Sequence, residues 1–241
     1  MTKSVVLVTG STSGIGLATA RRFAERGDVV VFNSAHSVEA GEHLASITYE
    51  SRYVQADISD AEDCERLVAT VLEHYGRLDV LVNNAGTTKL IPFRDLDAAS
   101  VDVWRAIFEV NVFGTWQLSV AAMPLLRQSR GSIVNVSSIA GLRATGTSIP
   151  YAASKAALNH MTVLLAKTAG PEVRVNAVAP GLIDTPWTQD WASVRSHVQG
   201  VAPLKRSGTP DDVADVIVAL ATASYVTGQV VAVDGGLTIA T

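Results

Sequence analysis

TGSTSGIG, residues Thr9–Gly16, connects a short apolar run to an amphipathic helical pattern. The run 5–8 precedes it, and hydrophobic positions such as Ala18 and Phe23 follow it. Glycines allow such a turn to be tight and its backbone to approach a pyrophosphate, whose charge then meets the positive end of the helix dipole. A glycine-rich turn alone is a weak signal, but between a strand and a helix it indicates a dinucleotide-binding site.

The alternation of strand and helix continues along the chain. Predicted strands, each a short β-branched run followed by a helical pattern, lie near Val5, Val29, Tyr53, Val80, Ile133, Val175 and Val230. Segments 29–32, 80–82 and 230–233 are almost continuously apolar, which is typical of parallel strands buried on both faces. The sequence therefore predicts an α/β fold, a single-domain doubly wound (Rossmann) sheet of seven parallel strands with helices on both faces.

Nothing in the 241 residues marks a second domain, so we expect one domain over residues 1–241. The longest interruption of the strand and helix rhythm is the segment 184–206. It contains Pro186, Trp187, Trp191 and Pro203. Long insertions of this kind are often lids, so we expect a substrate lid here.

Composition excludes several classes of protein. The net charge is only −4 and no basic block is present, so we expect a small-molecule partner and no nucleic acid. Cys64 is the only cysteine, which excludes an internal disulfide and a C-x-x-C metal site, and its apolar neighbours at helical spacing predict a buried thiol. The chain shows no secretory segment and no apolar run of transmembrane length, so we expect a cytoplasmic protein without a membrane partner.

Tyr151 and Lys155 are four positions apart, which places them on one face of a predicted helix. A free phenol has a pKa of about 10, and a neighbouring ammonium can lower it until the phenol exchanges protons near neutral pH. The alternative is a surface Tyr followed by a solvated Lys, because this spacing is common. Ser138 follows the predicted strand 133–136 and could face the same crevice, where its hydroxyl would bind a carbonyl oxygen. Most serines at strand ends instead satisfy turn backbone, and that alternative stays open for Ser137 and Ser138.

Other polar or small residues also follow predicted strands. Asp57 comes after the third strand, and the run NNAG, residues Asn83–Gly86, comes after the fourth. These positions belong to the crevice of a doubly wound sheet. Asn and Gly also serve in turns through local hydrogen bonds and left-handed backbone, and both roles can hold together.

Taken together, these motifs closely resemble the short-chain dehydrogenase/reductase family, in the branch that includes the 3-oxoacyl-acyl-carrier-protein reductases. The motifs occur in family order over essentially the whole chain, and they are TGxxxGIG at Thr9–Gly16, NNAG at Asn83–Gly86, Asn111, Ser138, YxxxK at Tyr151–Lys155, and Pro180-Gly181. The resemblance implies an NAD(P)-dependent oxidoreductase that transfers a hydride between nicotinamide and a ketone or secondary alcohol.

The resemblance also implies a catalytic tetrad. Tyr151 would be the general acid/base, and Lys155 would lower its pKa and hold the nicotinamide ribose. Ser138 would orient the substrate oxygen. Asn111 would distort a helix locally and hold a water that links Lys155 to solvent, although its position between two valines otherwise looks like an ordinary polar interruption.

The same resemblance implies the cofactor contacts. The phosphates would meet Gly10, Ser13, Ile15 and Gly16; the adenine Asp57 and Ile58; the adjoining ribose Asn83, Ala85 and Gly86; and the nicotinamide Pro180, Gly181, Ile183 and Thr185. The carboxamide of the nicotinamide would be held by Thr185 or by the Ile183 backbone.

The end of the second strand departs from the pattern that distinguishes NAD from NADP. NAD enzymes normally place an acidic residue there, and NADP enzymes an arginine. Here Ser34 occupies the position expected for Asp, between Asn33 and the nearby His36. Without a carboxylate to repel it, a 2′-phosphate could be held by these three residues, so we favour NADP(H), with NAD(H) as the alternative.

The sequence does not name the carbonyl or alcohol that is the substrate. Trp187, Trp191 and Leu142 indicate an apolar cleft wall, although the tryptophans serve equally well as lid packing or subunit contacts. Arg143 could meet an anionic substrate group, but a solvated loop residue is the simpler interpretation. A non-catalytic dinucleotide-binding regulator is the rival function, and the intact tetrad argues against it. The resemblance implies a homotetramer built on helices near 100–125 and 151–168 and on the last strand, and Phe113, Trp116 and Leu118 fit such an interface.

Overall fold

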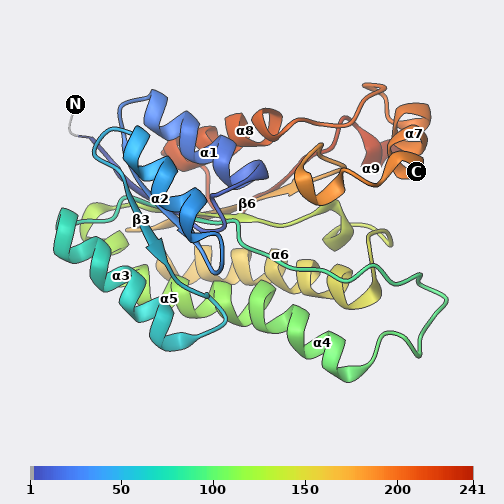
Figure 1. Ribbon diagram of the computed structural model, residues 1–241, viewed down its shortest axis with the longest axis horizontal. Helices are drawn as coiled ribbons and strands as arrows, with labels where there is room; N and C mark the ends of the chain where they lie inside the picture. The colour runs from blue at the N-terminus through green and yellow to red at the C-terminus, as the bar shows by residue number, and fades with distance from the viewer. Residues whose placement is uncertain (1–2, 241) are drawn as a thin grey trace.

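The computed structural model describes residues 3–240 as a parallel seven-stranded sheet between two layers of helices (Figure 1). The strand order is β3-β2-β1-β4-β5-β6-β7, and every neighbouring pair is parallel. The strands are β1 (Val5–Val8), β2 (Val29–Ser34), β3 (Arg52–Gln55), β4 (Val80–Asn83), β5 (Ser132–Val136), β6 (Arg174–Pro180) and β7 (Val230–Val233). The predicted doubly wound fold and all seven predicted strands are therefore confirmed.

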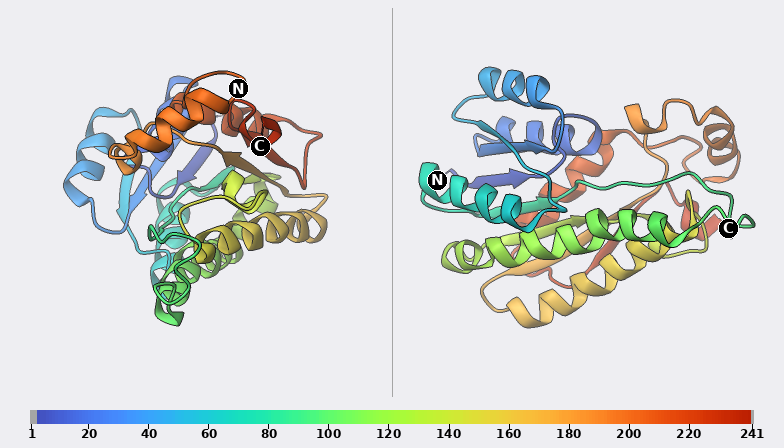
Figure 2. Two further views of the ribbon diagram at one scale, coloured as in Figure 1. Left: turned by 90° about the vertical axis from the view of Figure 1, so that its right-hand side faces the viewer. Right: turned by 60° about the horizontal axis from the view of Figure 1, so that its bottom comes forward.

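The helices cover both faces of the sheet (Figure 2). One face carries α1 (Gly14–Glu25), α2 (Val38–Ile47) and α8 (Pro210–Thr222), and the other carries α3 (Ala61–Tyr75), α5 (Thr115–Ser129) and α6 (Ile149–Ala169). The remaining helical segments are α4 (Val101–Phe108), the π-helix η1 (Glu109–Gly114), the short 3₁₀ turns η2 (Ile139–Gly141) and η3 (Pro186–Thr188), α7 (Ala192–Val201) and α9 (Leu237–Ala240).

The apolar strand sequences follow from this layering. In β1, Val5 and Leu7 enter the core shared with α3, α5 and α6, whereas Val6 and Val8 enter the core shared with α1 and α8. Because both faces are covered, both sets of alternating side chains in such a strand face a core, which favours an almost continuously apolar sequence. The last strand is different: β7 pairs only with β6, and its residues remain partly exposed. The expectation of burial on both faces is thus correct for 29–32 and 80–82 and wrong for 230–233, because β7 is an edge strand.

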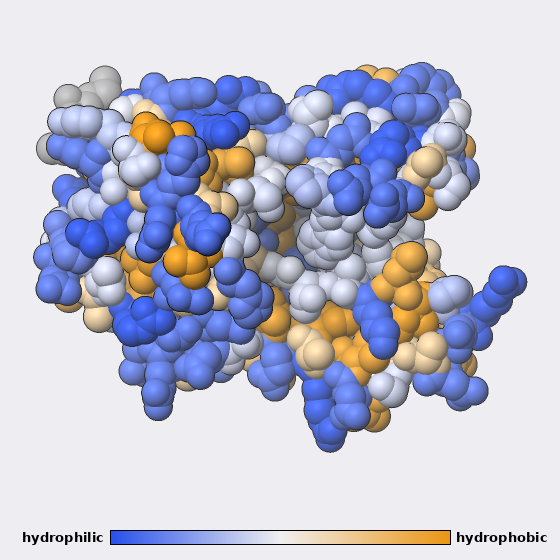
Figure 3. Space-filling model, in the orientation of Figure 1, coloured by the Kyte–Doolittle hydropathy of each residue, from blue (hydrophilic) through white to orange (hydrophobic). Residues whose placement is uncertain are grey.

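The functional motifs meet at the carboxyl edge of the sheet. β1 pairs with β2 on one side and with β4 on the other, so the chain changes direction across the sheet at β1. The ends of β1, β4, β5 and β6 are nearly level, because Val8 pairs with Val82, Asn83 with Asn135 and Val136 with Val178. Ligands of doubly wound sheets bind in the crevice at such a switch point. In the orientation of Figure 1, the molecular surface is hollowed near its middle (Figure 3).

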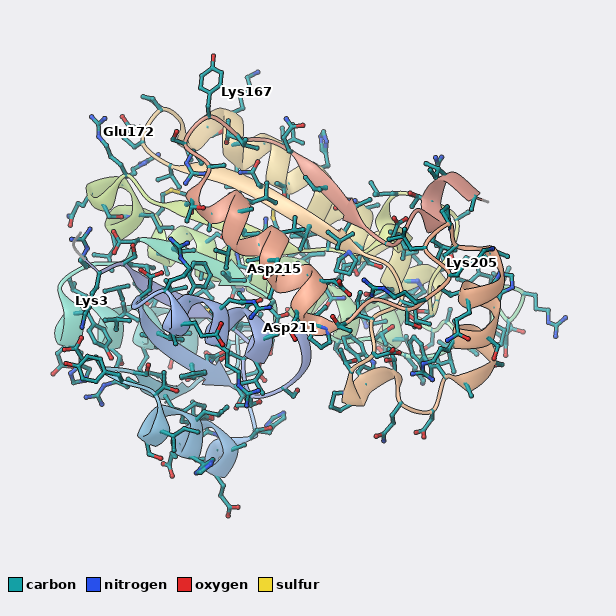
Figure 4. All side chains as sticks on the ribbon, turned by 90° about the horizontal axis from the view of Figure 1, so that it is seen from above. Lys3, Lys167, Glu172, Lys205, Asp211 and Asp215 are labelled. Carbon is teal, nitrogen blue, oxygen red and sulfur yellow. The ribbon has the colours of Figure 1, made fainter. Side chains whose placement is uncertain are left out.

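The glycine turn leads into α1, and the packing of α1 on α8 holds that helix in place. Arg22 of α1 pairs with Asp211 at 3.3 Å and with Asp215 at 2.8 Å, and Figure 4 shows both carboxylates on α8. Because these pairs are exposed, they contribute little stability each, and the apolar contact between the helices dominates.

The segment 184–206, predicted as a lid, forms η3 and α7 and returns to its starting point. Ile183 and Gly208 form an isolated parallel bridge, with the Asp184 amide donating to the Gly208 carbonyl at 2.8 Å. Arg195 of α7 pairs with Asp184 at 2.8 Å and donates to the Thr188 carbonyl at 3.2 Å. The segment therefore begins and ends at neighbouring positions, and Arg195 connects its two helical elements, η3 and α7.

Cys64 is buried in α3, as the sequence predicts, and its Sγ contacts the Ile58 carbonyl at 3.3 Å. Burial raises the pKa of this thiol to about 12, so it is a structural residue and not a nucleophile. Within residues 3–240, no helix is long and apolar enough to cross a membrane, and no group of three His, Cys, Asp or Glu side chains could hold a metal ion.

Candidate active site

The glycine turn after β1 is fixed by the loop after β4. The Thr9 hydroxyl accepts the backbone N–H groups of Asn84 and Ala85, each at 3.0 Å. The Asn84 amide in turn donates to the carbonyls of Thr9 and Gly10 at 2.8 and 3.0 Å. The sequence placed Thr9 in the glycine turn and Asn84 at the crevice or in a turn, but their pairing with each other depends on contacts about 75 residues apart that no local pattern reveals.

This turn forms a cradle that fits a dinucleotide phosphate. Gly10 has a φ of +59°, and a Cβ on Gly16 would lie 2.4 Å from both the Asn84 amide nitrogen and the Gly10 oxygen. Among the described residues Ser13, the N-cap of α1, makes no side-chain cap bond, and the first turn of α1 carries no acidic residue. The positive end of α1 is therefore left for an anion that the backbone can approach closely.

Tyr151 and Ser138 come together from two elements. Ser148 caps α6 by accepting the Tyr151 backbone N–H at 3.3 Å, which places Tyr151 in the first turn of the helix. Ser138 follows β5, accepts the Ala140 N–H at 3.1 Å and forms a hydrogen bond with the Tyr151 side chain. Ser138 therefore serves the turn, as one interpretation predicts, and also lies beside the phenol, while its binding of a substrate oxygen stays a prediction. Ser137 is buried and serves backbone, donating to the Lys155 carbonyl at 3.2 Å.

Lys155 lies one turn further along α6, with its Nζ 5.7 Å from the centre of the Tyr151 ring. The ammonium donates to the Val136 carbonyl at 3.0 Å, and the residue is only 4% exposed. Burial lowers the pKa of Lys155 to about 8. The amine is thus still mainly protonated at pH 7, in a place where its charge is poorly solvated.

The pKa of Tyr151 corrects one expectation. Burial raises the pKa of the phenol, and the hydrogen bond with Ser138 acts in the opposite direction without reversing it. Lys155 does not lower the pKa of Tyr151 as predicted, because its ammonium bonds to the Val136 carbonyl and does not contact the phenol oxygen. At neutral pH the phenol therefore carries its proton.

Asn111 lies in η1, where α4 widens into a π-helix before α5 begins. The local helix distortion expected at Asn111 is confirmed. Its Oδ1 accepts the Thr87 N–H at 2.8 Å, and its Nδ2 donates to the Thr87 carbonyl at 2.9 Å and to Ser154 Oγ at 3.0 Å. The Asn111 carbonyl accepts the Thr115 hydroxyl at 3.2 Å.

Gly86 passes between Asn111 and Lys155. A Cβ at this position would lie 3.2 Å from Asn111 Oδ1 and 3.5 Å from Lys155 Nζ. The loop after β4 therefore needs a glycine to pack this closely on the polar groups of η1 and α6.

A cavity of about 690 Å³ joins the glycine turn to Tyr151 and Lys155. Many of the predicted site residues line it, namely Gly10, Ser13, Ile15, Ala85, Gly86, Ser138, Tyr151, Lys155, Pro180, Gly181, Ile183 and Thr185. Thr185 also caps η3, and the Ile183 carbonyl accepts the Thr188 hydroxyl, so both are held by hydrogen bonds inside the lid segment.

The remaining predicted cofactor residues lie outside the lining of this cavity. Asn83 is buried, and its side chain donates to Ser119 and Asn135, so any contact with a ribose would come from its backbone. Ile58 is likewise buried in the core, Gly16 lies in α1 beneath the turn, and Asp57 accepts two hydrogen bonds from Ser59.

The three residues predicted to bind a 2′-phosphate differ in how buried their side chains are and in the hydrogen bonds that these side chains already make. The Asn33 amide is buried and donates to the carbonyls of Val54 and Ala56, so its assignment as a phosphate ligand is wrong. The Ser34 hydroxyl bonds to the Tyr53 hydroxyl at 2.9 Å and accepts the Ser37 N–H at 3.1 Å. His36 is exposed just beyond β2.

Part of the cavity is lined by the segment 184–206. Trp187, Trp191 and His197 contribute from this segment, and Arg143 contributes from the loop before α6. Among the described residues, Leu142 does not line this cavity, and it is exposed beside Arg143, which does. Hydrophobic surface gathers at the lower right of Figure 3, over the segment that leads into α4, where Leu90 and Leu96 are exposed.

Comparison with known proteins identifies relatives over the whole chain. Residues 10–238 match a family model described as enoyl-(acyl carrier protein) reductase. A Streptomyces violaceoruber protein, provisionally named ketoacyl reductase 2 of the granaticin polyketide synthase, is 58% identical, with 96% of this chain and 95% of that protein covered. The 3-oxoacyl-acyl-carrier-protein reductase of Thermotoga maritima is 40% identical over 98% of each chain. A solved short-chain dehydrogenase/reductase from Brucella melitensis superposes with a TM-score of 0.91 at 33% identity, covering 98% of this chain and 96% of that one.

Proposed function

The chain belongs to the short-chain dehydrogenase/reductase family, in the branch of the 3-oxoacyl-acyl-carrier-protein reductases, and from that premise we propose a specific reaction for its cleft. The protein is an oxidoreductase of a family that binds nicotinamide dinucleotides. We propose that it reduces a ketone carried on an acyl chain, or oxidises the matching secondary alcohol, with Tyr151 as the general acid/base. The juxtaposition of Tyr151, Ser138 and Lys155 with the glycine turn in one cavity is the observation that carries this proposal.

Each part of the cleft has a role in holding the cofactor. Gly10, Ser13 and Ile15 would meet the phosphates at the uncapped end of α1, supported by Gly16. The backbone of Asp57 and Ile58 would meet the adenine, and Ala85 and Gly86, with the Asn83 backbone, the adjoining ribose. Pro180, Gly181, Ile183 and Thr185 would frame the nicotinamide, which supplies or accepts the hydride when bound.

Proton transfer falls to Tyr151. During reduction, its O–H donates a proton to the carbonyl oxygen while a hydride reaches the carbonyl carbon, and oxidation reverses both transfers. A phenol that is protonated at neutral pH, as the raised pKa of Tyr151 requires, suits the role of acid in reduction. Ser138 orients the reacting oxygen. The Lys155 ammonium, 5.7 Å from the centre of the Tyr151 ring, would hold the nicotinamide ribose, and Asn111 ties η1 to Ser154 of α6.

For the dinucleotide, we favour NADP(H). Ser34, the last residue of β2, replaces the carboxylate that would repel a 2′-phosphate, and the exposed His36 lies two residues further on. Steady-state turnover with each cofactor tests this choice, and a higher kcat/KM with NAD(H) would contradict it.

Two further features belong to the same proposal. The segment 184–206 acts as the substrate lid, because it lines the outer cavity and is tied at its base by the Ile183 and Gly208 bridge. The protein assembles as a homotetramer, a proposal that the exposed apolar residues of η1 and α5 support. Leu118 must be removed from that interface, since it is fully buried in the core.

The test is a screen of 3-ketoacyl thioesters, simple ketones and secondary alcohols, followed by the absorbance of the reduced nicotinamide. Tyr151→Phe removes only the phenol oxygen and should lower kcat by about 10² to 10⁴. Full activity in that variant would refute the assigned role. Tight dinucleotide binding without turnover of any carbonyl or alcohol would instead favour the non-catalytic regulator.

A further inference from the structure

Ser154 connects the π-helix η1 to the helix that carries Tyr151 and Lys155. Both Ser154 and Asn111 are fully buried, and they lie 43 residues apart in the chain. The Asn111 Nδ2 donates to Ser154 Oγ at 3.0 Å, and Ser154 Oγ donates to the Tyr151 carbonyl at 2.7 Å. A single hydroxyl therefore contacts both elements.

The hydrogen-bonding capacity of the two side chains is well matched. An asparagine amide has two N–H donors and one acceptor oxygen, and a serine hydroxyl has one donor. The Asn111 donors go to Thr87 O and Ser154 Oγ, and its Oδ1 accepts the Thr87 N–H. The one Ser154 donor goes to Tyr151 O. The result is a continuous chain of bonds from the loop after β4, through η1, to α6.

This series of hydrogen bonds fixes the position of η1 relative to α6, which regular helix geometry does not determine. A π-turn contains an extra residue, so the ordinary bonding pattern along the helix is interrupted and side chains decide its register. Asn111 Oδ1 and Lys155 Nζ both lie within 3.5 Å of the point where a Cβ on Gly86 would stand. A shift of η1 along α6 would therefore change what surrounds the Lys155 ammonium.

We propose that Ser154 is a positioning residue of this site, whose hydroxyl holds η1 and α6 in register so that Tyr151 and Lys155 face the cleft in one geometry. It acts through Asn111 and the α6 backbone and touches neither substrate nor cofactor. The kinetic consequences rest on the proposed oxidoreductase function, whereas the structural consequence does not.

Ser119 is a matched control. It is also fully buried, donates to a carbonyl of its own helix (Thr115 O, 2.7 Å) and accepts an asparagine amide from another element (Asn83 Nδ2, 3.0 Å). Ser119→Ala therefore removes the same kinds of bond as Ser154→Ala. The difference is that the two partners of Ser119, Asn83 in β4 and Thr115 in α5, lie in neither η1 nor α6.

The kinetic test compares the two variants with the wild type. Ser154→Ala should lower kcat by about tenfold or more and leave the KM for the nicotinamide within about twofold. It should also shift the pH above which activity falls, because that pH reflects the ionisation of Lys155. Ser119→Ala should lose a similar amount of thermal stability, while its kcat and pH profile stay within about twofold of wild type. Equal kcat values and pH profiles in the two variants would overturn the proposal.

Amide hydrogen exchange supplies a readout that does not depend on turnover. In the protein alone, Ser154→Ala should accelerate exchange at Thr87 and across 109–114 by about tenfold, and Ser119→Ala should leave these amides unchanged. If the wild type turns over no carbonyl or alcohol, the proposed function fails and exchange alone decides the role of Ser154. Unchanged exchange in Ser154→Ala, or changed exchange with full activity, would show that Ser154 does not position this site.

Discussion

Lys155 holds a positive charge where its surroundings disfavour one, and this gives a pH dependence with a definite sign. Burial lowers its pKa from 10.5 to about 8, so the ammonium loses its proton as the pH rises through that value. Because kcat/KM reports the ionisation of the free enzyme, kcat/KM for the dinucleotide should fall above about pH 8. Initial rates between pH 6 and 10 measure this limb.

Lys155→Arg provides the control, because a guanidinium stays protonated throughout that range. The variant should be slower at every pH and should lack the limb near pH 8. A limb that persists unchanged in Lys155→Arg would assign it to a different group and contradict the role given to the ammonium.

Single residues also show what sequence can and cannot reveal about this site. Helical periodicity predicted that Tyr151 and Lys155 share one face, whereas their catalytic roles came from the family resemblance; Gly10 could be predicted because a tight turn needs its backbone freedom. Asn84 and Ser154 could not, because their roles arise from partners 43 to 75 residues away. The raised pKa of Tyr151 was also out of reach, since it depends on how deeply the phenol is buried.

Among whole elements, the strands were the easiest to predict and the segment 184–206 the hardest. Parallel strands covered on both faces require apolar runs, so sequence and structure agree closely at β1, β2 and β4. The edge strand β7 has the same composition without the burial, because composition does not record position in a sheet. In the segment 184–206 the sequence offered only prolines and tryptophans as signals. The ion pair of Arg195 with Asp184 could not be predicted from them.

That tie allows a test of whether the segment 184–206 acts as the proposed lid. Arg195→Met removes both the ion pair with Asp184 and the bond to the Thr188 carbonyl, which together fix η3 against α7. Because a partly exposed pair of this kind contributes about 1 kcal/mol, the KM for the carbonyl should rise about threefold to fivefold, with kcat within about twofold. Steady-state kinetics with the substrate found in the screen measure both values.

Arg77→Met is the matched control for the lid. Arg77 pairs with Asp79 at 2.6 Å next to the start of β4, at the end of the sheet opposite the cavity. Its loss should leave the KM for the carbonyl unchanged. If Arg195→Met behaves in the same way, the segment 184–206 does not close over the substrate.

The molecule as a whole leaves apolar surface on the helices that border the site. Phe113 of η1, Trp116 and Val120 of α5, and Val163 and Leu164 of α6 are each between 43% and 52% exposed. Isolated exposed side chains are ordinary, but several on adjacent elements are typical of an interface. The partly exposed edge strand β7 offers a second such surface.

The proposed tetramer therefore makes a prediction about assembly in solution. Wild-type protein at micromolar concentration should sediment as a tetramer, and Trp116→Glu should shift it to dimers or monomers, because a buried unpaired carboxylate is costly in an interface. Ile47→Glu, which changes an equally apolar side chain that is 66% exposed at the end of α2, should leave the tetramer intact. Analytical ultracentrifugation distinguishes these species directly. A wild type that sediments as a monomer would rule out the tetramer, and dissociation by Ile47→Glu alone would place the interface on the α2 side of the sheet.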